Sequence, residues 1–366
     1  MARRLQSDKV LFGTVVALTL FGALMVFSAS AVVATEKFGS SSYFLIRQLG
    51  WAGAGFVALV VLMYLDYRRL ASPAVVFPAL ALELVFLVVV LFADRSHNTR
   101  RWLHWGPASF QPSEFSKIVL VLFLAYFLEQ RLGEVNDLKH TLLPVGVVTG
   151  ASMALVMAEP DFGTALAIAM IVAAMLFTAG LRLKYFASAA LGAVPVVYWL
   201  VFHSTYRHNR VLAFLDPYAD PLGKGFQIIQ SFIAVGTGGI TGVGLMEGKQ
   251  KLFYLPEPQT DFIFAVVSEE LGFIGAVAVL VAFGIILWRG WRASARCTCE
   301  FGRLLALGLT VMVVGQALVN MSVVLGLLPT KGIPLPLVSY GGSSLFVTLA
   351  AVGILLNISQ DEADEA

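Results

Sequence analysis

The stretch DFIFAVVSEELGFIGAVAVLVAFGIILW, residues 261–288, decides what kind of fold this chain adopts. From residue 262 onward it is an apolar run, and about 20 such residues cross a bilayer as one helix. Asp261 stands at the entrance of this run, and Glu269 and Glu270 follow about two helical turns later. Acidic side chains inside spanning helices are costly and rare, so these acids are candidate functional residues.

The composition extends this interpretation to the whole chain. Of its 366 residues, 58% are hydrophobic and 13% are charged, whereas soluble domains have roughly 45–50% apolar and about 25% charged residues. We therefore expect an all-α polytopic membrane protein. The formal net charge of +2 gives no indication of a nucleic-acid partner. Cys297 and Cys299 cannot supply the four ligands of a structural zinc site, and we interpret them as incidental.

Apolar runs of roughly 17–25 residues predict ten spanning helices. They cover residues 10–34, 47–65, 72–93, 114–130, 141–158, 162–180, 185–202, 262–288, 303–327 and 337–358. We expect a single membrane domain over residues 1–360, with a large extracytoplasmic loop at 203–260 between the seventh and eighth spans. Residues 361–366 are expected to form a short, acidic, disordered tail.

The distribution of Lys and Arg predicts the orientation of these spans. An even number of spans places both termini on one side, and the short loops on that side are rich in Lys and Arg, which predicts that both termini are cytoplasmic. The polar segments 94–113, 159–161, 203–260 and 328–343 then all face outward. Because non-helical backbone near a membrane survives only where protein buries it or water reaches it, these segments predict an outward cavity.

The entry into the fourth span combines polar residues of both charges. Ser113 is expected to cap this helix, with Glu114 in the first turn, where the helix dipole favours an acid. Lys117 lies three residues farther on, along the same helix face. A cation near the positive end of a helix is explained by a phosphate ligand or by an ion pair with Glu114. Of these two interpretations, ligand binding is favoured.

Other outward residues also have both a structural and a functional interpretation. Arg101 is a candidate for binding anionic head groups, and it stands among tryptophans that are typical of interfacial anchors. Asp161 either caps the sixth span or lines the cavity. Lys331 and Tyr340 lie in a broken entry into the last span and are expected at the cavity rim. Asp261 itself has a structural alternative, because Asp is a favoured N-cap residue.

A series of short motifs runs in order along nearly the whole chain. They are Phe27-Ser-Ala-Ser30, Arg101-Trp102, Gln111-Pro-Ser-Glu114 with Lys117, Pro160-Asp-Phe-Gly-Thr164, Asp216-Pro-Tyr-Ala-Asp-Pro221, Gly225-Phe-Gln-Ile-Ile-Gln-Ser231, Leu255-Pro-Glu257, Thr260-Asp-Phe-Ile-Phe264, Glu269-Glu-Leu-Gly272 and Pro334-Leu-Pro-Leu-Val-Ser-Tyr-Gly-Gly-Ser343. Together they closely resemble the SEDS family (shape, elongation, division and sporulation), which includes the FtsW, RodA and SpoVE proteins. Within that family, Pro329-Thr-Lys-Gly332 is more similar to the division-type FtsW members. Glu159 departs mildly from the family pattern, in which Gln often precedes Pro-Asp.

The resemblance implies a SEDS-type fold and an inverting peptidoglycan glycosyltransferase that polymerises lipid II on the outer face of the cytoplasmic (inner) membrane. It also implies a role at the division septum. The implied partners are lipid II, the undecaprenyl-pyrophosphate-linked glycan, a class B penicillin-binding protein as transpeptidase, other divisome proteins and membrane lipids. A RodA-like role in elongation, with the same chemistry, is the alternative within the family.

The resemblance also implies roles for particular residues. It places the essential carboxylate at Asp261, as the base that activates the acceptor hydroxyl. Substrate binding is expected of Arg101, Glu114, Lys117, Asp161, Lys331, Ser339 and Tyr340, with Glu257, Glu269 and Glu270 in support. The cations among these residues, or a divalent ion such as Mg²⁺ or Mn²⁺, would bind the pyrophosphate. No other cofactor is expected.

Two other classes of function remain open from the sequence. A lipid II flippase would also need many spans and intramembrane acids, but transporters often have inverted repeats with matching broken helices, and the chain has no convincing repeat. A scaffold that recruits division proteins would leave the outward polar residues unexplained. Glycan ladders made by the purified protein would separate polymerisation from transport.

Overall fold

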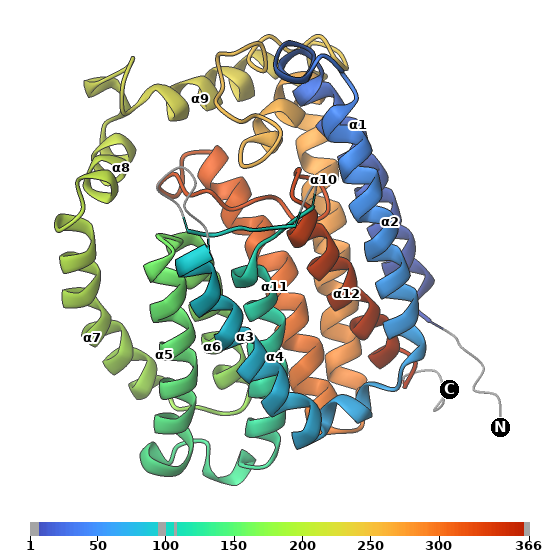
Figure 1. Ribbon diagram of the computed structural model, residues 1–366, viewed down its shortest axis with the longest axis vertical. Helices are drawn as coiled ribbons and strands as arrows, with labels where there is room; N and C mark the ends of the chain where they lie inside the picture. Colours follow the sequence, from blue (N-terminus) through green and yellow to red (C-terminus); the bar gives the residue numbers. More distant parts are fainter. Residues whose placement is uncertain (1–6, 94–99, 106–107, 362–366) are drawn as a thin grey trace.

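Each predicted span coincides with a helix in the computed structural model, which describes residues 7–93, 100–105 and 108–361. These helices are α1 (Lys9–Phe38), α2 (Tyr43–Tyr64), α3 (Pro73–Ala93), α4 (Pro112–Glu129), α5 (Leu143–Ala158), α6 (Phe162–Thr178), α7 (Leu183–Phe202), α10 (Ile263–Arg296), α11 (Glu300–Val324) and α12 (Gly342–Ile358). Figure 1 shows that successive helices run up and down the long axis of the molecule. The all-α prediction is therefore confirmed.

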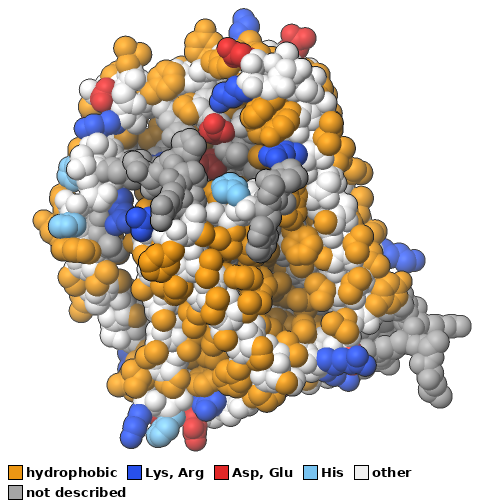
Figure 2. Space-filling view, in the orientation of Figure 1, with side chains coloured by type: hydrophobic (Ala, Val, Ile, Leu, Met, Phe, Trp, Pro, Cys, Tyr) orange, Lys and Arg blue, Asp and Glu red, His pale blue; other side chains and the backbone are white. Residues whose placement is uncertain are grey.

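The apolar helices have the lengths and surfaces expected of membrane spans. Six helices in the described part of the chain are long and apolar enough to cross a membrane, whereas α6 and α12 are shorter, with 17 residues each. The 18-residue helix α4 carries Glu114, Lys117 and Glu129 within its length. Figure 2 shows a broad apolar band on the surface, with most charged side chains gathered at its two ends.

The two ends of the described chain lie on the same face of the bundle (Figure 1). Asp8 caps α1 and also binds Arg289 near the end of α10. Asp361, just after α12, pairs with Arg68 at 3.1 Å and accepts a hydrogen bond from the hydroxyl of Tyr67. Asp361 is buried, so it belongs to the folded domain and not to the predicted tail. Residues 362–366 of that tail, and residues 1–6, lie outside the described part of the chain.

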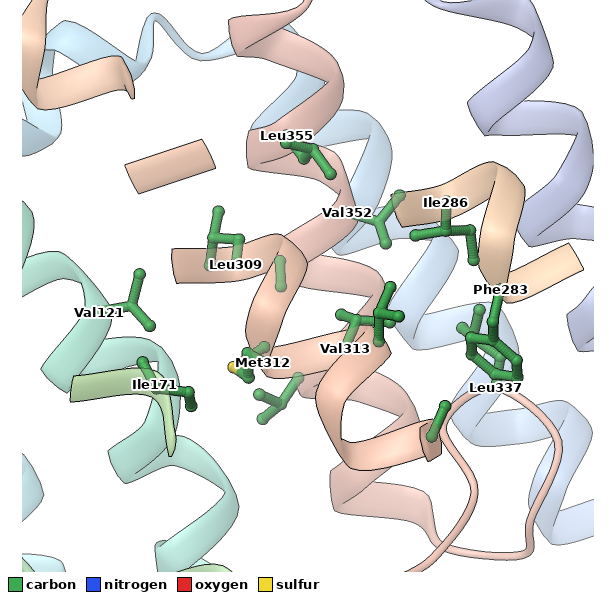
Figure 3. Close-up of a cluster of buried hydrophobic side chains, with 14 of the residues drawn as sticks. Val121, Ile171, Phe283, Ile286, Leu309, Met312, Val313, Leu337, Val352 and Leu355 are labelled. Carbon is green, nitrogen blue, oxygen red and sulfur yellow. The ribbon is translucent and has the colours of Figure 1, made fainter. Parts of the chain in front are cut away.

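The interior of the bundle is organised around α11, which is the most deeply buried of the long apolar helices. Figure 3 shows Leu309, Met312 and Val313 of α11 among side chains from α4, α6, α10 and α12. Small residues allow the closest approaches, as is common between membrane helices. A Cβ atom added to Gly353 of α12 would lie 2.6 Å from the backbone oxygen of Leu59 in α2.

The segments that were predicted to face outward contain more regular structure than the sequence indicated. The 203–260 loop includes α8 (Thr205–Leu215), a 3₁₀ turn η4 (Pro217–Ala219) and α9 (Phe226–Gly238). These elements follow α7 around the periphery of the molecule (Figure 1). Strands β1 (Leu103–Trp105) and β2 (Ala108–Phe110) form an antiparallel hairpin before α4, with Leu103 paired to Phe110. On the opposite face, the connections contain η1 (Tyr67–Ala71), η2 (Leu132–Glu134) and the π-helical turn η3 (Leu138–Leu142).

Helix α10 is broken at Gly272, where φ is 66° and ψ is −161°. This is a conformation that glycine adopts readily and other residues avoid. The segment from Gly239 to Gly244 fits against the break: Phe273 donates its N–H to the carbonyl of Gly239 at 2.9 Å, and Val243 donates to the carbonyl of Glu269 at 3.0 Å. The segment between α9 and α10 thus satisfies the backbone groups that the break exposes.

Candidate active site

Asp261 lies in the loop that leads into α10, and its side chain is half-buried. The helix begins at Ile263, and its N-cap is Phe262, so the alternative interpretation of Asp261 as the helix cap is wrong. The backbone carbonyl of Asp261 accepts a 2.8 Å hydrogen bond from Asn320 of α11, which also donates to the carbonyl of Ile333 at 2.7 Å. One buried amide therefore holds the Asp261 loop beside the segment before α12.

The segment before α12, residues 325–341, forms the wall next to Asp261. A Cβ atom added to Gly332 would lie 3.0 Å from a carboxylate oxygen of Asp261, so the backbone passes close to that group. Ser339 is buried, and its hydroxyl donates to the carbonyl of Thr260 at 2.6 Å while it accepts the N–H of Leu335 at 2.8 Å. Ser339, predicted to bind substrate, is thus placed to join the two segments.

Two cations and two further acids act electrostatically on Asp261. Arg210 of α8 and Arg101 lower the pKa of its carboxyl, whereas Asp161 and Glu257 raise it. Burial is the strongest influence, and with it the pKa of Asp261 rises to about 7. Such a carboxylate is a far stronger base than an ordinary Asp, and about half of it is ionised near neutral pH.

Arg210 is the residue at this site that the sequence reasoning missed. It stands on α8, and its guanidinium donates to the carbonyl of Thr330 at 2.8 Å. The contact ties α8 to the wall beside Asp261. Because residues 203–260 were interpreted as one long loop, nothing local to Arg210 indicated a site. The only available signal was a second arginine three residues earlier, at Arg207.

Arg101 and Asp161 meet at the turn between α5 and α6. The Nε of Arg101 donates to the carbonyl of Glu159 at 3.1 Å, and a second guanidinium nitrogen donates to the carbonyl of Pro160. Asp161 caps α6 by accepting the N–H of Thr164 at 3.1 Å, as one of its two interpretations predicted. The other interpretation is compatible with this capping, because Asp161 also contributes to the electrostatic field at Asp261.

Glu114 and Lys117 form a buried ion pair and do not face solvent. The Nζ of Lys117 lies 2.9 Å from both carboxylate oxygens of Glu114 and 2.5 Å from the Oε1 of Gln316 in α11. Each of the two side chains is only 3% exposed. The helix cap is Gln111 and not Ser113 as predicted, because α4 already begins at Pro112.

The ion pair is nevertheless connected to the wall of the site. Gln316, which holds Lys117, donates from Nε2 to the carbonyl of Pro334 at 2.9 Å. Asn320 lies one helical turn farther along α11 and holds the neighbouring carbonyl of Ile333. Lys117 therefore reaches the site through α11, which favours the ion-pair interpretation over direct contact with a phosphate.

Lys331 and Tyr340 both stand in the segment before α12 and pack against aromatic rings. The Nζ of Lys331 stands 4.6 Å from the ring centre of Phe162, and burial lowers the pKa of its amine to about 8. The ring of Tyr340 packs edge-on against Phe44 with the ring centres 4.9 Å apart. Burial raises the pKa of the Tyr340 hydroxyl, although Arg47 opposes this shift.

The supporting acids divide into one exposed and two fully engaged groups. Glu257 is exposed and accepts a 2.7 Å hydrogen bond from Gln259. Glu269 accepts the backbone N–H of Lys249 at 2.8 Å. Glu270 accepts the N–H of Met246 at 3.0 Å and the hydroxyl of Ser28 at 2.7 Å, and it pairs with Lys251 at 2.6 Å. Glu269 and Glu270 thus anchor the segment that precedes α10.

The expected Mg²⁺ or Mn²⁺ has no all-protein binding site in the part of the chain that is described. Within residues 7–93, 100–105 and 108–361 there is no group of three or more His, Cys, Asp or Glu side chains placed to hold a metal ion. Asp161, the acid beside Asp261, is already engaged by Thr164 and Gln111. These residues therefore do not fit a resident divalent ion.

Comparisons with known proteins agree along the whole chain. The family model for FtsW, RodA and SpoVE, described as "Cell cycle protein", matches residues 8–364. The probable peptidoglycan glycosyltransferase FtsW of Trichlorobacter lovleyi is 47% identical over 98% of this chain and 94% of its own length. Stage V sporulation protein E of Bacillus subtilis is 40% identical over 98% of both chains.

Solved structures give the same result for the fold. A chain from a peptidoglycan synthase complex that coordinates polymerization and crosslinking superposes with a TM-score of 0.81 at 33% identity, covering 98% of this chain and 99% of that one. Thermus thermophilus RodA, a rod shape determining protein, superposes with a TM-score of 0.72 at 28% identity, covering 98% of both chains. The helices, the ordered motifs and these likenesses together establish that the chain belongs to the FtsW/RodA/SpoVE family of cell cycle proteins.

Proposed function

We propose that this protein is a peptidoglycan glycosyltransferase that polymerises lipid II on the outer face of the cytoplasmic membrane, with Asp261 as its general base. The observation that carries the proposal is a half-buried carboxylate just before the first turn of α10, with Arg210 and Arg101 close enough to lower its pKa. The relatives named as peptidoglycan glycosyltransferases support the reaction class. The location of Asp261 at one end of the apolar band suits a substrate that stays anchored in the bilayer.

In the proposed reaction, the ionised Asp261 accepts the proton of the 4-hydroxyl of the N-acetylglucosamine of the acceptor lipid II. That oxygen attacks the anomeric carbon of the lipid-linked strand from the side opposite the leaving group, so the α linkage is inverted to β. Undecaprenyl pyrophosphate departs with the bonding electrons. A positioned general base contributes about 10²–10⁴-fold to such a reaction.

The departing pyrophosphate requires positive charge that is fixed before the reaction. We assign this role to Arg101 and Arg210, with Lys331 at the edge of the site. Backbone carbonyls hold both arginines: those of Glu159 and Pro160 for Arg101, and that of Thr330 for Arg210. Lys117 is given a supporting role, because it is buried in its pair with Glu114.

We further propose a role in septal synthesis with a class B penicillin-binding protein as partner. The support is that five FtsW relatives match at 44–47% identity, whereas the RodA structure matches at 28%. The likeness to a chain of a synthase complex that combines polymerization with crosslinking supports a transpeptidase partner. Placement of both termini in the cytoplasm and location at the septum belong to this same proposal.

The decisive experiment incubates the purified protein with fluorescent lipid II, with and without a cognate transpeptidase. We expect glycan ladders from the wild type and a loss of about 10²-fold or more in rate for Asp261→Asn, which keeps the shape and removes the base. Glu247→Gln, at an exposed acid of the same loop, is the matched control and should retain the wild-type rate. Transfer of lipid II between leaflets without ladders would instead identify a flippase, and equal rates for Asp261→Asn and wild type would refute the assigned base.

A further inference from the structure

Glu159, at the turn between α5 and α6, is a buried acid that the proposed chemistry does not use. Its side chain is 0% exposed. Neither of its carboxyl oxygens has a hydrogen-bond partner among the residues that the structure describes. A buried polar group without a partner is costly, and an unpaired buried charge is more costly still. Glu159 is therefore a residue whose protonation state matters to its surroundings.

The charged groups around Glu159 belong to the candidate active site. Arg101, from the segment before β1, lowers the pKa of Glu159, and Asp161, in the same turn, raises it. Lys331, from the segment before α12, stands over Phe162, the first residue of α6. Burial has the largest effect and, with Asp161, brings the pKa of Glu159 to about 9. At neutral pH the carboxyl is consequently uncharged.

The position of the Arg101 guanidinium depends on that neutrality. Arg101 binds the backbone carbonyls of Glu159 and Pro160, and its charge also acts on Asp261. An ionised carboxylate at residue 159, on the very residue that Arg101 already touches, would attract the same guanidinium. A charge-assisted bond between them would be stronger than the present bond to a neutral carbonyl.

We propose that Glu159 is a positioning residue: its neutral carboxyl keeps the Arg101 guanidinium on the turn backbone, with its charge directed to Asp261 and the substrate pyrophosphate, and its ionisation withdraws that charge. This inference rests on the proposed function, because it assigns Arg101 to the pyrophosphate. Glutamine at this position has the shape of the neutral acid and cannot ionise. Glu159→Gln should therefore preserve the neutral-pH arrangement at every pH.

The consequence is a bell-shaped dependence of turnover on pH. Asp261 must lose its proton to act, so the rate rises through about pH 7. Glu159 must keep its proton, so the rate falls through about pH 9. Lys331, whose amine has a pKa of about 8, is the competing source of an alkaline decline. The two candidates can be separated, because glutamine at residue 159 removes one titration and arginine at residue 331 removes the other.

The test measures initial rates of lipid II polymerisation from pH 6 to pH 10.5 for wild type, Glu159→Gln and Lys331→Arg. We expect Glu159→Gln to match wild type at pH 7 and to be roughly tenfold faster than wild type at pH 10, because only the wild type carries an ionised carboxylate at residue 159 there. An unchanged alkaline decline in Glu159→Gln, or a decline abolished only in Lys331→Arg, would overturn the proposal. So would a folded Glu159→Gln protein that has lost its activity at pH 7.

A binding measurement separates this inference from the proposed function. Fluorescent lipid II in detergent micelles is titrated with wild type and Glu159→Gln at pH 7 and pH 10. Weaker binding by wild type alone at pH 10 supports the role of Glu159, even if neither protein makes glycan ladders, in which case only the polymerase proposal fails. Equal weakening in both proteins would refute the role of Glu159.

Discussion

Asp261 and the pair Glu269–Glu270 stand within one short stretch of sequence, yet the structure gives them opposite surroundings. In the described part of the chain the Asp261 carboxylate accepts no hydrogen bond, and its partners are charges at a distance. Glu269 and Glu270 accept hydrogen bonds from three backbone N–H groups, and Glu270 also binds Ser28 and Lys251. A carboxylate whose oxygens accept hydrogen bonds from the protein stabilises the fold. A carboxylate whose oxygens accept none from the protein is available to take a proton from a substrate.

The largest expected effect tests the structural half of this comparison. Glu270→Gln removes the charge partner of Lys251, whose side chain is only 5% exposed. Breaking one side of a buried ion pair costs about 3–5 kcal/mol, so thermal unfolding in detergent should occur at a clearly lower temperature. Asp261→Asn, measured in parallel, should unfold at or above the wild-type temperature. Reversal of this order would remove the distinction between the two regions.

The break in α10 is the next largest effect, because it creates the geometry that lets Glu269 and Glu270 face the loop. Gly272→Ala requires alanine at a φ of 66°, and the added Cβ would lie 2.3 Å from the backbone nitrogen of Gly242. We expect a loss of at least about 1–3 kcal/mol in unfolding free energy. Gly284→Ala is the control within the same helix, since its Cβ would meet nothing within 4 Å. Equal stability of the two variants would show that the break is not required.

The acid side of the pH profile sharpens the functional half of the comparison. Burial raises the pKa of Asp261 to about 7, and the base works only without its proton. The polymerisation rate should therefore fall about tenfold for each pH unit below that value, a change of about 1.4 kcal/mol per unit. Initial rates between pH 5 and pH 7.5 provide the measurement. A rate that stays flat down to pH 5 would mean that Asp261 titrates as an ordinary acid or is not the base.

The smallest effect concerns the cation on α8. Arg210→Gln removes a positive charge that lowers the pKa of Asp261, so that pKa should rise and the acid limb should move to higher pH by less than about one unit. If Arg210 also binds pyrophosphate, KM for lipid II rises as well. Lys224→Gln, at an exposed lysine of the same loop, is the control. If the acid side of the pH–rate profile is the same in Arg210→Gln as in wild type, Arg210 does not act on Asp261.

The pH dependence of folding stability should also reveal the state of Glu159. Its sign is opposite to the one that a salt-bridged acid produces. Burial raises its pKa to about 9, whereas the unfolded carboxyl has its ordinary value of about 4.5. Between these values the unfolded state has already released the proton, so wild-type stability falls as pH rises. Glu159→Gln should be the more stable protein, by a margin that grows from pH 5 to pH 9. Melting curves over this range check the expectation.

Most of the fold followed from the sequence because the bilayer imposes strict conditions on it. A spanning segment must be predominantly apolar, and its backbone hydrogen bonds must be satisfied within the protein, so the ten apolar runs could be located from the sequence. The segments that connect the spans are not subject to this constraint. Nothing in the 203–260 stretch predicted α8 or α9, and the hairpin before α4 was equally unforeseen. The backbone N–H and C=O groups of such segments can form hydrogen bonds either with water or with neighbouring parts of the chain. The local sequence does not show which of the two occurs.

The candidate site was predicted in part. Asp261, Arg101, Asp161 and Lys331 do gather at one end of the bundle. Lys117 was expected to face a phosphate and is instead buried against Glu114 and Gln316. Its spacing of three residues from Glu114 fits either outcome, because spacing on one helix cannot show what a neighbouring helix contributes.

The sequence by itself therefore determined which segments enter the membrane. The length of an apolar run is a property of the local sequence, and it decides whether that run can span the bilayer. Tertiary structure alone decided which acids remain available for chemistry. Glu269 and Glu270 are engaged because Gly272 breaks their helix and admits residues 242–251. Asp261 is left to face Arg210, a residue 51 positions away in the chain, because α8 brings Arg210 against the Thr330 carbonyl in the wall beside Asp261. Hydrogen bonds and charges between distant segments depend on three-dimensional proximity, which no local pattern in the chain encodes.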